Sequence, residues 1–115
     1  MLPTNRRVRK ESFEKVLKDG VFVHSTNLYL RYIDRKDDLP SLFAFVVPNK
    51  VKKTSVGRHL IKRRLIAVVE KFLITIKPGF LVVVFVKKDI STLPFVEINK
   101  EVLELLKKAK MLNEK

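Results

Sequence analysis

A continuous run of β-branched, aliphatic and aromatic residues, Phe80–Val86, constrains the fold more than any other segment of the chain. The turn sequence Lys77-Pro-Gly79 precedes this run and a polar segment follows it. A run of this length and composition predicts a central β-strand. It is also the longest apolar run, and it falls well short of the roughly 18 apolar residues that a membrane span needs. We therefore expect a sheet built around this strand and no membrane span. Binding of the chain's basic residues to a membrane surface is a less favoured alternative, because bulky aromatic side chains are not interleaved with them; no membrane partner is expected.

The remaining elements follow from the spacing of apolar residues. Strands are predicted at Val21–His24, Leu28–Ile33 and Ser41–Val47. Helices are predicted from Glu11 or Ser12 to about Asp19, from a cap at Thr54 or Ser55 to about Ile74, and from Phe95 to Leu112. The chain shows no internal repeat or linker, and its 115 residues suit one domain. The order αβββαβα predicts an α+β protein with a single α/β sandwich domain over residues 1–115.

A basic segment in the middle of the chain predicts an anionic partner. From Leu39 to Val69 there is no Asp or Glu. The same stretch holds seven cationic residues: Lys50, Lys52, Lys53, Arg58, Lys62, Arg63 and Arg64. Like charges this close repel one another, and the chain as a whole carries a formal charge of +13. The alternative is a solvated charged face, but such faces usually carry acidic i,i+4 partners. We interpret the segment as a site for nucleic acid.

The alternating strand Leu28–Ile33 predicts a second candidate surface. Leu28, Leu30 and Tyr32 share one face, and Tyr29, Arg31 and Ile33 share the other. An aromatic ring beside a cation is typical of platforms on which single-stranded nucleic acid stacks. The alternative is a solvated outer face with no partner. In the long helix, Ile61, Leu65, Val68 and Phe72 form one apolar stripe that we expect to face the core.

The sequence offers no convincing catalytic constellation. Its two histidines, His24 and His59, stand far apart and outside any metal-ligand motif. There is no cysteine, no phosphate-binding loop and no nucleophile beside a base. His24 is interpreted as an ordinary strand residue, and His59, among arginines, as an RNA contact. No signal peptide is recognised, and a protein without cysteine fits the reducing cytoplasm. We expect a cytoplasmic binding protein that does not cut RNA alone.

Three segments resemble the protein subunit of bacterial ribonuclease P. The N-terminal pattern Leu2-Pro…Asn5-Arg6…Arg9-Lys10…Phe13-Glu-Lys-Val16…Gly20 is similar to that family's signature. Phe45-Val-Val-Pro-Asn-Lys-Val51 resembles its third strand and the loop that follows. Arg58-His-Leu-Ile-Lys-Arg-Arg-Leu65 resembles its arginine-rich helix. The order of the elements agrees as well.

The resemblance implies a fold, an activity and partners. The sheet would be a mixed four-stranded one, with a left-handed crossover around the basic helix, an exception to the usual rule. The catalytic RNA would remove the 5′ leader of precursor tRNA with Mg²⁺, and the protein would bind both RNAs as a monomer in a 1:1 ribonucleoprotein. No cofactor is expected on the protein itself.

The resemblance also assigns residues to the two RNAs. Contacts to the catalytic RNA would come from Arg6, Arg9, Lys50, Lys52, Lys53, Arg58, His59, Lys62, Arg63 and Arg64. The leader would lie in a cleft between the first helix and the sheet, lined by Phe13, Leu17, Tyr29, Arg31 and Val46. His59 and Leu60 depart from the family pattern, which has Asn and Arg there. The alternative function is a general RNA-binding or ribosome-associated protein with no role in cleavage.

Overall fold

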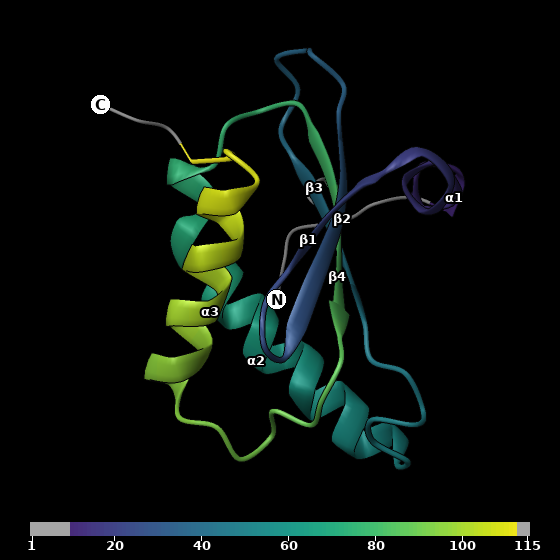
Figure 1. Ribbon diagram of the computed structural model, residues 1–115, viewed down its shortest axis with the longest axis vertical. Helices are drawn as coiled ribbons and strands as arrows, with labels where there is room; N and C mark the ends of the chain where they lie inside the picture. The colour runs from purple at the N-terminus through teal and green to yellow at the C-terminus, as the bar shows by residue number, and fades with distance from the viewer. Residues whose placement is uncertain (1–9, 113–115) are drawn as a thin grey trace.

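The computed structural model describes residues 10–112, and it contains every predicted helix and strand in the predicted order (Figure 1). The elements are α1 (Lys10–Asp19), β1 (Val21–His24), β2 (Leu28–Asp34), β3 (Leu42–Val46), α2 (Ser55–Phe72), β4 (Phe80–Val86) and α3 (Phe95–Lys108). A 3-10 turn at Leu73–Thr75 extends α2. The αβββαβα prediction is therefore confirmed.

The predicted end of α3 at Leu112 is wrong by one turn. Lys110 adopts a left-handed backbone conformation with φ 57°, which an α-helix cannot continue through. The amide of Met111 donates to the carbonyl of Leu106 at 3.0 Å, and that of Lys110 to the carbonyl of Lys107 at 3.0 Å. This is the hydrogen-bond pattern of a Schellman motif, with lysine at the position that usually holds glycine.

The four strands form one mixed sheet in the order β1-β2-β4-β3. Strand β2 runs antiparallel to β1 and to β4, whereas β3 runs parallel to β4. The parallel pair is joined through α2, since parallel neighbours need a crossover connection. β4 has hydrogen-bonded neighbours on both edges, so the prediction of a central strand is confirmed.

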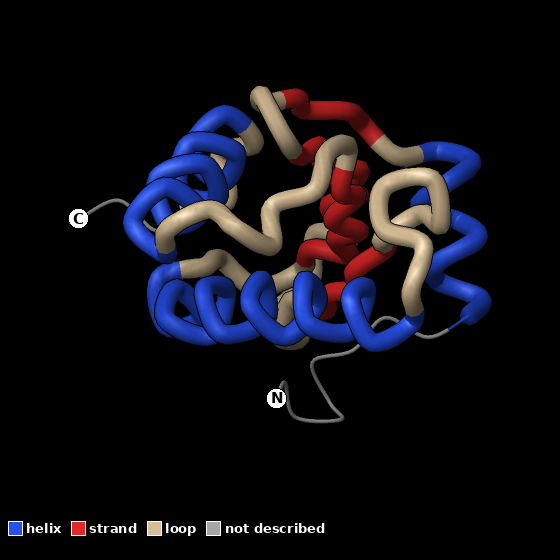
Figure 2. The backbone as a smooth tube through the Cα atoms, turned by 90° about the horizontal axis from the view of Figure 1, so that it is seen from below, coloured by secondary structure: helices blue, strands red, loops and turns tan. Residues whose placement is uncertain are grey.

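Helices cover both faces of the sheet, which explains why β4 is apolar at every position. Val82 and Val84 point into a large core shared with α2 and α3. Leu81 and Val83 point the other way, into a small core that includes Val16 of α1. Figures 1 and 2 show α1 alone on its side of the sheet. The predicted stripe on α2 is buried at Ile61, Leu65 and Val68, and Phe72 packs partly buried against the same core.

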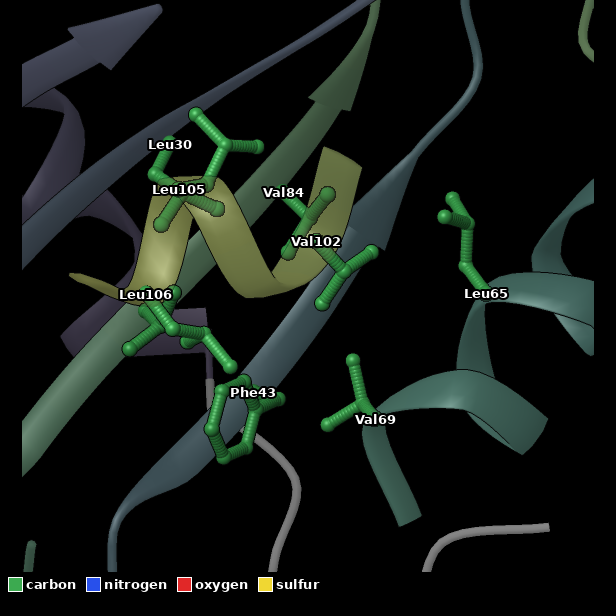
Figure 3. Close-up of a pocket in the computed structure, with 9 residues that line it drawn as sticks. Leu30, Phe43, Leu65, Val69, Val84, Val102, Leu105 and Leu106 are labelled. Atoms are coloured by element: carbon green, nitrogen blue, oxygen red, sulfur yellow. The ribbon is translucent and has the colours of Figure 1, made fainter. Parts of the chain in front are cut away.

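The large core closes around a small apolar cavity between the sheet and the two long helices. Figure 3 shows Leu65 and Val69 of α2 and Phe43 of β3 converging on the same space as side chains of β2, β4 and α3. All nine lining residues are Leu, Val or Phe. A water molecule needs polar partners, so a space with this lining stays dry. We assign the cavity to packing rather than to a ligand site.

A carboxylate on α3 anchors the turn between β1 and β2. Glu101 accepts a hydrogen bond from the backbone amide of Asn27 at 2.6 Å and another from its side-chain amide at 2.9 Å. It also accepts one from the hydroxyl of Ser25. The β1–β2 hairpin is thereby held against the closing helix, and its other side is left to face α1.

Candidate nucleic-acid interface

Four rings lie side by side on the face of the sheet that α1 occupies. We call Phe22, His24, Tyr29 and Phe85 the aromatic row. Ring centroids are 4.6 Å apart for Tyr29 and Phe85, 5.3 Å for His24 and Tyr29, and 5.7 Å for Phe22 and His24. These separations are those of stacked aromatic pairs. The row therefore offers a continuous aromatic surface across three strands.

Strand register brings the row together. Tyr29 of β2 is paired with His24 of β1 on one side and with Phe85 of β4 on the other. Residues directly opposite in a sheet point to the same face. Phe22 joins them because it lies two positions before His24 on the same strand.

Arg31 ties the row to α1. Its guanidinium lies 4.0 Å from the centre of the Phe22 ring and donates to the backbone carbonyl of Leu17 at 2.6 Å. The Nε atom is buried and makes no hydrogen bond within residues 10–112. A buried donor without a partner is costly, so the carbonyl and ring contacts of the same guanidinium hold Arg31 in place at the expense of this N–H.

The five predicted leader residues all lie on α1 or on the α1-facing side of the sheet. Phe13 and Val46 pack against the small core. Leu17 and Arg31 are joined by the hydrogen bond above, and Tyr29 stands within the aromatic row. The sequence alone does not indicate Phe22 or Phe85 as site residues, and it indicates His24 only as an ordinary strand residue. These rings come together through strand pairing, which the residue periodicity of a single segment does not reveal.

Arg58 holds the loop before α2 in place. We call this loop, which carries Lys50, Lys52 and Lys53, the basic loop. The Thr54 side chain caps α2 by accepting from the Gly57 amide at 3.1 Å. Arg58 then donates to the carbonyls of Lys52 at 3.0 Å and Lys53 at 2.8 Å. The predicted cap at Thr54 is confirmed, and the guanidinium of Arg58 serves to fold the loop back onto the helix.

The Arg64 side chain also donates hydrogen bonds to backbone carbonyls. Its guanidinium donates to the carbonyls of Ile90 at 3.0 Å and Ser91 at 2.6 Å, and also to that of Leu93. It lies 4.7 Å from the centre of the Phe95 ring. The side chain thus closes the loop between β4 and α3 onto α2.

Lys62 and Arg63 differ from these two arginines. Neither side chain makes a hydrogen bond or ion pair with another residue of the segment 10–112. Arg63 is exposed and Lys62 is half-buried. His59, Lys50 and Lys53 are also exposed. Arg6 and Arg9 lie outside the described residues, so their assignment stays a prediction.

Lys52 forms a salt bridge with Asp89, which lies in the loop between β4 and α3. Its Nζ atom lies 3.0 Å from a carboxylate oxygen of Asp89. Hydrogen bonds from Ser91 and then Lys52 lower the pKa of Asp89 to about 2. A depressed acid pKa stabilises the fold above the ordinary pKa of 3.8, and this contribution is lost as the pH falls toward 2. At neutral pH Asp89 therefore competes with phosphate for Lys52.

Replacing Asp89 by Asn is expected to strengthen RNA binding. The amide keeps an oxygen acceptor for Ser91 but frees Lys52, which adds up to about 0.9 to the salt slope, or about eightfold in affinity at 0.1 M salt. Filter binding over a salt series measures both quantities. Asp38→Asn, which removes an exposed charge from another loop, is the matched control. Equal effects of the two variants would show that net charge alone matters.

The aromatic row and the basic loop lie at the same end of the sheet. Val46, at the end of β3, is paired with Phe85 of β4, and the loop to α2 begins directly after β3. Figures 1 and 2 show this loop on the side of the sheet where α1 lies. A single chain of nucleic acid can therefore meet stacking rings and cations in succession.

Neither a metal centre nor a membrane span is found within the described segment. Between residues 10 and 112 no group of three or more His, Asp and Glu side chains is placed to hold a metal ion. None of the helices there is long and apolar enough to cross a membrane. The arrangement supplies charge, stacking surface and shape.

Comparison with known proteins gives one consistent result. A family model described as ribonuclease P matches residues 2–110. The ribonuclease P protein component of Pseudanabaena sp. is 32% identical over 114 residues, which cover 98% of each chain. That of Synechocystis sp. is 34% identical over 86 residues, 74% of this chain and 69% of the relative.

Solved structures agree on the fold. The ribonuclease P protein of Staphylococcus aureus superimposes with a TM-score of 0.81 at 19% identity, over 96% of this chain and 100% of the other. That of Thermotoga maritima, in complex with 1-(4-fluorophenyl)-2-thiourea, gives 0.78 at 23% identity, over 89% of this chain and 98% of the other. At these identities the likeness concerns the fold alone.

Proposed function

The chain belongs to the ribonuclease P family, and on that premise we propose that it is the RNA-binding protein component of a ribonucleoprotein ribonuclease P. The family match over residues 2–110 carries the proposal. In this function the protein binds a catalytic RNA and precursor tRNA, and assists removal of the 5′ leader. The RNA performs the phosphodiester hydrolysis with Mg²⁺, and the protein contributes binding in a 1:1 complex.

The basic segment supplies the contacts to the catalytic RNA. Lys62 and Arg63 have no protein partner among the described residues, so binding phosphate breaks no existing interaction. Lys50, Lys53 and His59 extend the same surface along the loop and the first turns of α2. Arg58 and Arg64 act differently, because their guanidinium groups hold the two flanking loops in place. In the basic surface, Arg58 and Arg64 thus fix the shape of the loops, whereas Lys62 and Arg63 are available to bind phosphate.

The aromatic row and α1 supply the contacts to the leader. Bases of an unpaired strand stack on aromatic rings without regard to sequence, which suits leaders of different sequences. Arg31 holds α1 at the edge of the row through its hydrogen bond to the Leu17 carbonyl. Phe13, Leu17 and Val46 provide apolar surroundings for the same unpaired RNA strand.

Reconstitution of cleavage tests this proposal. The purified protein is added to ribonuclease P RNA of the source organism with a precursor tRNA at low Mg²⁺. We expect faster cleavage and tighter binding of precursor than with RNA alone, and a smaller gain for mature tRNA. No gain over RNA alone would refute the proposal. Equal gains for precursor and mature tRNA would favour a general RNA-binding protein.

The same assay tests the aromatic row. Tyr29→Ala is expected to weaken precursor binding by about tenfold or more, the value of one stacked base. Tyr29→Phe keeps the ring and should retain the affinity. Mature tRNA, which lacks the leader, should bind both variants equally. If the Tyr29→Ala protein still preferred precursor tRNA over mature tRNA as strongly as the wild type does, the aromatic row would not be part of the leader site.

A further inference from the structure

An exposed apolar row crosses the basic face of α2. Val56 and Leu60 are one turn apart, and their side chains are 80% and 49% exposed. Together with Ser55, His59 and Arg63 they line a shallow open hollow. Arg64 stands one further turn along and stacks on Phe95, whose ring is 45% exposed. We call Val56, Leu60 and Phe95 the apolar row.

We infer that the apolar row, centred on Leu60, binds an unpaired base of the RNA partner. This inference rests on the proposed function and names a contact within it. Apolar side chains gain nothing from a phosphate, whereas the flat face of an unstacked base loses water when it packs against them. Arg63 lines the same hollow as Val56 and Leu60 and would hold a phosphate next to that base.

Charge decides among the possible occupants. Val56 and Leu60 lie within a stretch that has no acid from Leu39 to Val69, in a chain of net charge +13. A second copy of the chain would bring the same positive charge against it, which like-charge repulsion opposes. A polyanion with exposed apolar rings satisfies both the cations and the apolar side chains. RNA with an unpaired nucleotide is such a partner.

The geometry of α2 explains how a base reaches Leu60. The opposite stripe of the helix is fully buried at Ile61 and Leu65, so the helix cannot rotate to hide Leu60. The Arg58 and Arg64 contacts fix the loops at both ends of the hollow. The surface is therefore rigid before binding, which lowers the entropy cost of capturing one nucleotide.

Salt dependence distinguishes a base contact from a phosphate contact. Leu60→Ala is expected to weaken binding to ribonuclease P RNA about tenfold, or about 1.4 kcal/mol. The slope of log K against log salt should stay unchanged, because no counterion is released at an apolar contact. Ile74→Ala, which truncates another exposed apolar side chain outside the row, is the matched control and should change neither quantity.

Leu60→Arg gives the opposite test. If Leu60 faces a base, the added cation weakens binding or leaves it unchanged. A gain in affinity with a salt slope steeper by about one would show that this position faces a phosphate, and would overturn the inference. Unchanged affinity of Leu60→Ala, measured with a wild-type protein that does bind the RNA, would also overturn it. Failure of the wild-type protein to bind would refute the proposed function instead.

Cross-linking locates the base. The chain has no cysteine, so Leu60→Cys carries a single thiol that accepts a photoreactive aryl azide. We expect cross-links to one unpaired nucleotide of the RNA, with Ile74→Cys giving none at that position. Cross-links spread over paired helices would contradict the inference. Binding of phosphatidylglycerol vesicles that Leu60→Ala abolishes, with RNA binding intact, would assign the row to a lipid surface.

Discussion

The double variant Lys62→Ala, Arg63→Ala is expected to bind ribonuclease P RNA about 60-fold more weakly than the wild type at 0.1 M salt, with a salt slope lower by about 1.8. Each phosphate contact releases roughly 0.9 counterion, so two contacts account for both numbers. The expectation depends on these two side chains being unpaired within residues 10–112, so that no interaction in that part of the chain competes with phosphate for them. Fluorescence anisotropy over a salt series measures the two quantities together.

The fold should be insensitive to this change. Neither side chain has a partner within residues 10–112, so the free energy of unfolding should move by less than about 0.5 kcal/mol. Lys100→Ala, Lys107→Ala removes the same charge from exposed positions on α3 and serves as the control. If that control lowered the slope equally, the effect would belong to net charge and not to this face of α2.

Replacement of Arg64 by Ala is expected to lower the free energy of unfolding by about 3 kcal/mol, because hydrogen bonds from a charged donor contribute about 1.5–3 kcal/mol each and partial exposure reduces their sum. The change leaves the carbonyls of Ile90, Ser91 and Leu93 without their donor. For a domain of this size the loss corresponds to a melting temperature lower by about 10 °C. Thermal and urea unfolding followed by circular dichroism measure it.

Arg64→Lys separates structure from charge. Lysine keeps the positive charge but has no planar fork to reach several carbonyls, so most of the stability should still be lost. RNA bound by the folded fraction should show an unchanged salt slope in both variants. If the Arg64→Ala variant kept its melting temperature and its salt slope for RNA binding fell by about one, Arg64 would instead be a phosphate contact.

These two predictions divide residues that are alike in the sequence. Arg63 and Arg64 are neighbours of one type within one basic run, and nothing local distinguishes them. The difference arises from carbonyls 26 to 29 positions later, in a loop whose path depends on the packing of α3. A charge pattern therefore identifies a basic surface, whereas only tertiary structure shows which cations are free.

The strands show the same limit. The composition of Phe80–Val86 was enough to predict a central strand, and alternation in β2 correctly separated Leu30 from Tyr29. The aromatic row needed the register of three strands, because Phe85 and His24 become neighbours of Tyr29 only through pairing. Helix ends were predicted less well, since the end of α3 depends on Lys110 adopting a conformation that lysine rarely takes.

The anchoring of the β1–β2 turn by Glu101 has a consequence for synthesis of the protein. The turn is made early, but its anchor lies 74 residues later, within the last helix. During synthesis the hairpin is therefore made before its anchor, and a two-stranded hairpin alone is marginally stable. The surface that holds Tyr29 and His24 acquires its fixed shape only after α3 has been made and has packed against the turn.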